Sequence, residues 1–130
     1  MKKIQSSLIS KIDEFILSES NKLIYIYEIK PTGKVIEVIS VSLNIKVSKK
    51  WETIIYYDST HGYMHRHRRI DLTTDDYIVD QEGVRQRGTR RRLLRWAIED
   101  LKKNYIYYKR NFIKNNKMYL KRKNIQVDIY

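Results

Sequence analysis

The first third of the chain combines one helical pattern with two strand patterns. From Ile4 to Leu17 the apolar residues recur at steps of three and four, the spacing of a helix with one buried face. Residues 22–30 and 34–47 are rich in β-branched and aromatic side chains, and a Pro-Thr-Gly turn at 31–33 separates them. The pattern predicts an N-terminal helix followed by two antiparallel strands.

One face of the second of these strands changes from apolar to polar side chains along its length. Ile36 and Val38 are followed on that face by Ser40, Ser42 and Asn44, while the other face stays apolar. Antiparallel sheets commonly bury one face and leave the other solvated. We therefore expect a sheet that is buried on one side only over part of its area.

All three histidines fall within seven residues near the middle of the chain. Residues 51–57 are β-branched and aromatic, residues 58–62 have turn chemistry, and residues 63–72 form an extended return, so the pattern predicts a β-hairpin. Because side chains alternate along a strand, His65 and His67 share a face.

A four-residue loop at 59–62 would bring a carboxylate to this histidine face. In that register Asp58 lies opposite Tyr63 and Tyr56 lies opposite His65. The hairpin therefore predicts a candidate site formed by Asp58, His61, His65 and His67.

Imidazole carries protons near neutral pH and is the commonest metal ligand in proteins, so the cluster fits two kinds of site. In a metal-free site, one histidine takes the proton of a ribose 2′-hydroxyl and a second protonates the leaving oxygen. In the metal alternative, His61, His65 and His67 are the ligands. The neighbouring arginines oppose a bound cation, so we expect no metal and no cofactor. A solvated basic strand face without chemistry is one alternative to both kinds of site.

The second half of the chain predicts one more short strand, at 77–80, and one long helix that begins after Gly88-Thr89. The helix has an apolar stripe at steps of three and four: Leu94, Ile98, Leu101, Tyr105, Tyr108 and Phe112. Residues 114–117 end it, and residues 124–130 alternate as a final strand at a sheet edge or on a partner.

The order of these elements predicts a single α+β domain spanning residues 1–130. It has an N-terminal helix, an antiparallel sheet of four to six strands, a long amphipathic C-terminal helix packed on the sheet, and the final strand.

The chain has 27 Lys and Arg against 15 Asp and Glu, which gives a formal net charge of +12. This excess predicts a polyanionic partner: nucleic acid first, with RNA ahead of DNA, and then an acidic protein. The candidate nucleic-acid-binding residues are Arg66, Arg68, Arg69, Arg85, Arg87, Arg90, Arg91, Arg92, Arg95, Lys102 and Lys103.

The chain has no cysteine and no apolar run near eighteen residues. We therefore expect a cytoplasmic protein without a membrane partner. The sequence leaves a homodimer open.

The segment from Trp51 to Leu72 resembles the central hairpin of small prokaryotic proteins related to TumE, the toxin half of TumE–TumA toxin-antitoxin modules. The likeness consists of a strand ending in Tyr-Asp, a turn with His-Gly, and a closely spaced His-x-His-Arg. The chain departs in having Gly62 where another histidine is expected, and in its strand-rich region at 22–47. The resemblance implies a growth inhibitor that acts on nucleic acid and is held by an adjacent antitoxin, with Asp58, His61, His65 and His67 as its site.

Charge, hairpin and resemblance together predict a nucleic-acid-directed toxin, most simply a metal-independent endoribonuclease. In that interpretation the arginine cluster positions RNA and the histidine hairpin cleaves it. Two alternatives remain: a non-catalytic RNA- or DNA-binding protein of a mobile element or virus, and a basic interaction protein that docks an acidic partner.

Overall fold

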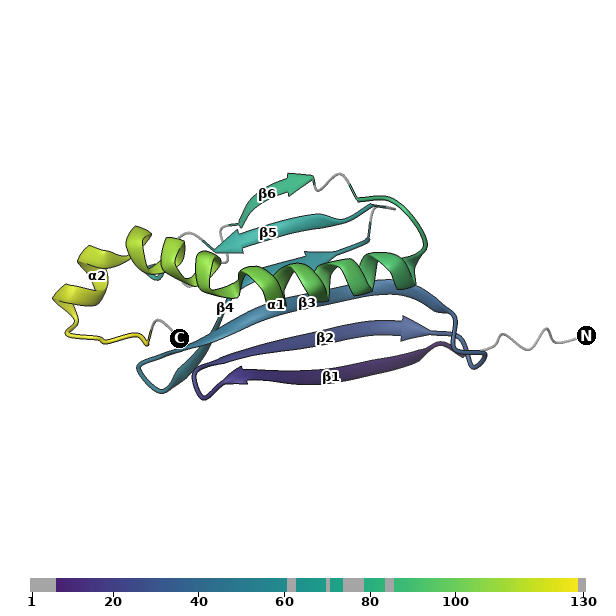
Figure 1. Cartoon of the computed structure of the whole chain (residues 1–130), viewed down its shortest axis with the longest axis horizontal. Helices are drawn as coiled ribbons and strands as arrows, with labels where there is room; N and C mark the ends of the chain where they lie inside the picture. Colours follow the sequence, from purple (N-terminus) through teal and green to yellow (C-terminus); the bar gives the residue numbers. More distant parts are fainter. Residues whose placement is uncertain (1–6, 61–62, 70, 74–78, 84–85, 129–130) are drawn as a thin grey trace, which may run out of the picture.

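The computed structural model describes residues 7–60, 63–69, 71–73, 79–83 and 86–128. In this part of the chain six strands form one antiparallel sheet, whose spatial order is the order of the strands in the sequence (Figure 1). The strands are β1 (Ile9–Ser18), β2 (Asn21–Ile29), β3 (Val35–Val47), β4 (Lys50–Asp58), β5 (His65–Arg69) and β6 (Val79–Gly83). Two helices follow, α1 (Arg90–Asn115) and the short α2 (Lys117–Arg122).

The α+β class, the antiparallel sheet and the long C-terminal helix are confirmed. The strands predicted at 22–30 and 34–47 are β2 and β3, and β6 overlaps the short strand predicted at 77–80, of which 77 and 78 lie outside the described residues. Thr89 caps α1 by accepting a hydrogen bond from the Arg92 amide at 3.2 Å.

The predicted N-terminal helix is wrong for the described residues, because Ile9–Ser18 is strand β1. A step of four residues returns to the same face in a strand as well as in a helix, so Leu8, Ile12 and Ile16 satisfy both periods. β1 is a strand because it pairs with β2 along nearly its whole length. The pairing runs from Ile9 opposite Ile29 to Ser18 opposite Asn21.

The final strand predicted at 124–130 is also wrong as far as residue 128, after which the chain lies outside the described residues. Asn124 has a φ of 54°, and the Ile125 amide donates to the Leu120 carbonyl at 2.9 Å. This turn folds the chain back, so Ile125 and Val127 pack against the core instead of joining a sheet edge.

α1 lies along one face of the sheet, mainly over β3 (Figure 1). Its buried apolar residues Leu93, Ala97, Leu101 and Phe112 meet a sheet face that includes Leu23, Val41, Leu43, Ile45 and Tyr57. Of the predicted stripe, Leu101 and Phe112 are central, whereas Leu94, Ile98, Tyr105 and Tyr108 are half-buried at its flanks. The stripe therefore lies one residue earlier in the first half of α1 than predicted.

A half-buried polar contact joins α1 to β4. The Tyr57 hydroxyl donates to Asp100 on α1, and the Tyr108 hydroxyl donates to the same carboxyl oxygen at 2.6 Å. Burial raises the pKa of Tyr57, and the hydrogen bond to Asp100 raises it further. Since Tyr57 faces α1, its neighbours Tyr56 and Asp58 face the opposite side of the sheet, which we call the open face.

No helix in the described ranges is long and apolar enough to cross a membrane.

Candidate functional site

The hairpin of β4 and β5 brings most of the predicted site together on the open face. Asp58 lies opposite His65, and Tyr56 lies opposite His67. The predicted register is wrong by two residues, because Ser59 is not part of a short loop. Its amide donates to the Val38 carbonyl at 3.0 Å, and its hydroxyl accepts from the Val38 amide at 2.9 Å. A shift of two residues preserves side-chain alternation, so the predicted residues still share a face.

The shortest contact of the site joins His67 to Asp58. His67 Nε2 lies 2.7 Å from Asp58 Oδ2, and the two side chains are only 13% and 12% exposed. The other carboxyl oxygen, Oδ1, accepts from the Thr60 hydroxyl at 2.9 Å and from the Thr60 amide at 3.3 Å. Both oxygens of Asp58 are therefore held, and the carboxyl group has a fixed orientation toward the imidazole.

Four rings line up across this part of the open face. Tyr56 stacks on His67 at 4.3 Å and 9° between ring planes, and Tyr63 lies 4.2 Å from His65. The two imidazole centroids are 6.3 Å apart, and His65 is 6% exposed. This aromatic row therefore places the two imidazoles side by side on the open face.

A groove of about 370 Å³ adjoins the row at Tyr56. Its lining combines polar and aliphatic side chains of the open face: Ile24, Ile26, Ser40, Ser42, Asn44, Thr53 and Tyr56. Asn44 Nδ2 donates to the Ser42 hydroxyl at 2.9 Å, and the Thr53 hydroxyl donates to Asn44 Oδ1. The Ser and Asn alternation in β3 was visible in the sequence, but only the sheet order shows that it adjoins the histidines.

His61, the third ligand of the metal alternative, lies outside the described residues. In the part of the chain that is described, no group of three or more His, Cys, Asp or Glu side chains is placed to hold a metal ion. The metal alternative therefore depends on a residue for which the structure gives no position.

The arginines beside the histidines point elsewhere. Arg66 lies over the Tyr108 ring of α1 at 6.0 Å, and Arg68 lines a small cavity of about 100 Å³ with Tyr108 and Phe112, so both face the helix. Arg69 forms an ion pair with Glu52. Arg66 and Arg68 therefore lie on the side of the sheet opposite His65 and His67, as strand alternation predicts, and nucleic-acid binding by the three arginines stays a prediction.

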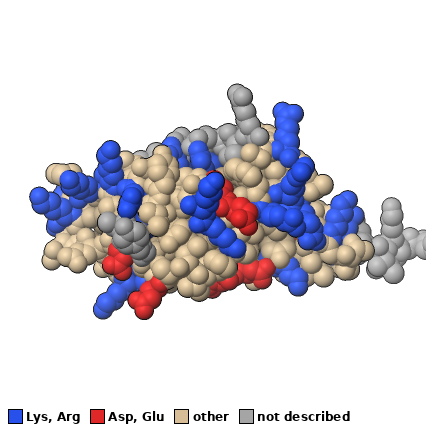
Figure 2. Space-filling view, viewed as in Figure 1, with Lys and Arg blue, Asp and Glu red and all other residues tan. Residues whose placement is uncertain are grey.

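The basic residues of α1 form a surface on the side of the sheet opposite the histidines. Arg91, Arg92, Arg95 and Lys103 are exposed, and Figure 2 shows Lys and Arg side chains spread over the face that carries α1. Lys102 is less exposed and lies over the Phe15 ring at 4.0 Å. We call Arg91, Arg92 and Arg95 the arginine surface.

The remaining predicted basic residues are near the start of α1. Arg90 Nε lies 3.8 Å from Glu37, Arg87 is exposed, and Arg85 lies outside the described residues.

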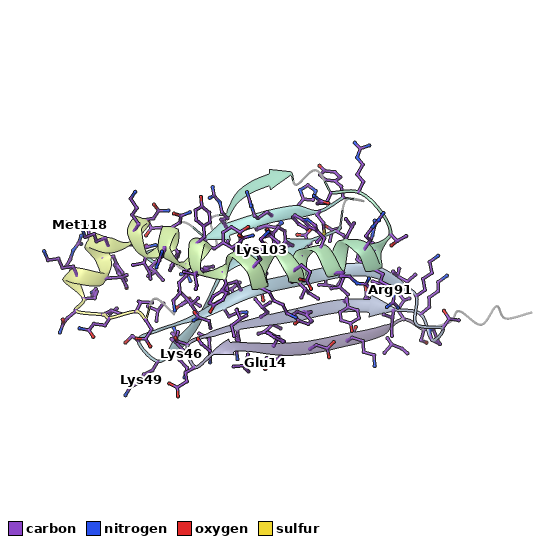
Figure 3. The ribbon with its side chains drawn as sticks, viewed as in Figure 1. Glu14, Lys46, Lys49, Arg91, Lys103 and Met118 are labelled. Carbon is purple, nitrogen blue, oxygen red and sulfur yellow. The ribbon has the colours of Figure 1, made fainter. Side chains whose placement is uncertain are left out.

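Glu37 contacts both the histidine hairpin and the start of α1 at one end of the sheet. It accepts a hydrogen bond from Ser59, which follows Asp58, and it lies beside Arg90 at the start of α1. Arg91, labelled at this end of α1 in Figure 3, donates to the Gly33 carbonyl at 2.9 Å. The histidine hairpin and the arginine surface thus face different ways but meet at the same end of the molecule.

Comparison with known proteins gives one match. The family model "Domain of unknown function (DUF7718)" matches residues 12–118. No curated protein and no solved structure matches the chain.

Proposed function

We propose a function for this chain from its site, because the chain belongs to the DUF7718 family, whose description leaves the function unknown. The proposed function is metal-independent cleavage of RNA by the Asp58–His67 pair and His65. The observation that supports it is the 2.7 Å contact between His67 Nε2 and Asp58. Such an activity, in the cytoplasm and held by an antitoxin with an acidic surface, fits the toxin of a toxin-antitoxin module.

The contact fits a general base. When Nε2–H donates to Asp58, the lone pair of His67 is on Nδ1, and the carboxyl group stabilises the imidazolium that forms when Nδ1 takes a proton. The proton would come from a ribose 2′-hydroxyl, whose oxygen then attacks phosphorus. As the bond from phosphorus to the 5′-oxygen breaks, His65 would protonate the leaving oxygen, giving a cyclic phosphate and a 5′-hydroxyl.

The groove beside Tyr56 is the proposed place for the nucleotide. Its serine, threonine and asparagine side chains provide donors and acceptors, and Ile24 and Ile26 provide apolar contact for a base. Single-stranded RNA fits this shape better than a duplex, because its unpaired bases can lie flat on an open sheet face.

The test is cleavage of single-stranded RNA oligonucleotides by the purified chain in the presence of a chelator. We expect His67→Gln and Asp58→Asn each to lower the cleavage rate about 100-fold or more, since general acid–base catalysis contributes about 10²–10⁴-fold. Glu99→Gln, an exposed carboxylate on α1, is the matched control and should cleave like the parent.

Cleavage that survives in both site variants, or that the chelator abolishes, would remove the proposed mechanism. Growth inhibition on expression, lost in the same variants, would support the toxin role.

A second candidate is a non-catalytic nucleic-acid-binding protein. The observation that favours it is the arginine surface, which is exposed on the side of the sheet opposite the histidines. This function would be selected if the parent binds RNA without cleaving it, and if His67→Gln and Asp58→Asn bind RNA as tightly as the parent. An acidic protein partner would use the same arginine surface.

A further inference from the structure

β1 is an edge of the sheet and carries an unusual density of exposed apolar side chains. Within the described residues it pairs only with β2, so its outer edge presents backbone groups to solvent over a ten-residue strand (Figure 1). Ile12 is 70% exposed and Ile16 is 60% exposed, and Leu8, Ile9 and Phe15 are exposed as well. A long apolar edge is a template for pairing with another strand.

We propose that β1 pairs antiparallel with β1 of a second copy of this chain, on a two-fold axis that passes through Ile12. The axis is perpendicular to the sheet, so the two six-stranded sheets become one and both open faces lie on the same side. The proposed dimer does not depend on any activity of the histidine site.

The charges of β1 favour this register. With the axis at Ile12, Lys11 lies opposite Asp13 of the second copy, and this pair occurs twice. An axis at Lys11 would place Lys11 opposite itself, and an axis at Asp13 or Glu14 would place two carboxylates opposite each other. Like charges directly opposite destabilise a strand pair, whereas opposite charges stabilise it. Asp13 is also oriented by the Tyr27 hydroxyl, which donates to it at 2.9 Å.

The same register pairs the exposed apolar side chains with each other. On the open face Ile12 meets Ile12, and Leu8 meets Ile16 of the second copy. On the face that carries α1, Ile9 meets Phe15 of the second copy. The β1–β1 interface therefore buries the most exposed apolar residues of the strand. The charge pattern and the apolar pattern both favour this same register.

The experiment measures the mass of the full chain in solution by light scattering after gel filtration. The parent should be a dimer. Lys11→Asp and Asp13→Lys should each be monomeric, because each places like charges opposite at two positions. An equimolar mixture of these two variants should form dimers again, since every pair then has opposite charges. Lys49→Asp, an exposed lysine in the turn between β3 and β4 (Figure 3), should remain dimeric.

A monomeric parent would overturn the proposal. So would single variants that dimerise like the parent, or a mixture that stays monomeric while circular dichroism shows both variants folded.

Discussion

Lys109 belongs to a long basic run in the sequence, yet its side chain is fully buried in the structure. The structure records no hydrogen-bond partner for its Nζ among the described residues. Burial lowers the pKa of Lys109, and the charge of Asp128 acts in the opposite direction. A lysine in this position costs stability at neutral pH, because its ammonium group is removed from water.

We therefore expect Lys109→Met to raise the free energy of unfolding at neutral pH, by about 1 kcal/mol or more. The gain should shrink as the pH rises. In the parent the folded lysine has the lower pKa, so between the folded and unfolded pKa values the unfolded state binds more protons and parent stability increases with pH. Urea denaturation of both proteins at several alkaline pH values measures this.

Lys103→Met is the control for that substitution, because Lys103 lies on the exposed side of α1. A stability change below about 0.5 kcal/mol is expected there. If Lys109→Met raises the free energy of unfolding by the same amount at every pH, the result would contradict the burial argument.

The shared face of Asp58, His65 and His67 was predictable from the sequence at the level of single residues. The alternation rule placed His65, His67 and Asp58 on one face, and the structure confirms that face. The pairing register was not predictable, because it depends on the contact between Ser59 and Val38, two residues 21 positions apart. Local turn chemistry contains no information about such a contact.

At the scale of elements, α1 is held on the sheet by a half-buried polar contact as well as by apolar packing. Asp100 accepts hydrogen bonds from Tyr57 on β4, from Tyr108 and, through its other oxygen, from Asn104 at 3.0 Å. The contact fixes the position of α1 along β4, because it requires three side chains from two elements to meet.

We expect Tyr57→Phe to lower the free energy of unfolding by about 1–3 kcal/mol, since it removes a buried donor to Asp100 while keeping the ring. Chemical denaturation measures the loss. Tyr107→Phe removes a hydroxyl from an exposed ring on the same helix and should change stability by less than about 0.5 kcal/mol. Equal effects of the two substitutions would show that the Asp100 contact contributes nothing.

The elements that the sequence predicted correctly are those with a single periodicity. β3 alternates strictly over most of its length, and α1 is long, capped and striped. β1 was assigned wrongly because its apolar steps of four fit a strand and a helix equally, and only pairing with β2 separates the two. The final strand failed for a different reason: a turn after α2 directs alternating residues onto the core, which no local pattern shows.

At the scale of the whole molecule, Lys and Arg side chains are spread over the face that carries α1 (Figure 2). The arginine surface is on the α1 side, and the first turn of α1 contains no acidic residue. Phosphates are attracted by such a surface, and their release of counterions makes binding dependent on salt.

We expect the triple substitution of Arg91, Arg92 and Arg95 by alanine to weaken binding to single-stranded RNA and to reduce the slope of affinity against salt concentration. Filter binding or fluorescence anisotropy at several ionic strengths measures both. The matched control replaces Lys121, Arg122 and Lys123, three exposed charges at the end of α2, by alanine. If both triple variants lose affinity equally, net charge and not the arginine surface determines binding.

The identical order of strands in the sheet and in the sequence has a consequence for synthesis on the ribosome. Each strand can pair with its predecessor as soon as it emerges, so the sheet needs no later segment to find its topology. α1 follows all six strands, and until it is made the apolar face of β2, β3 and β4 has no cover. At about 5–20 residues per second the delay between β4 and the middle of α1 lasts on the order of seconds. In that interval the nascent chain exposes both the apolar sheet face that α1 later covers and the apolar edge of β1, and exposed apolar surface and strand edges of this kind favour association between chains.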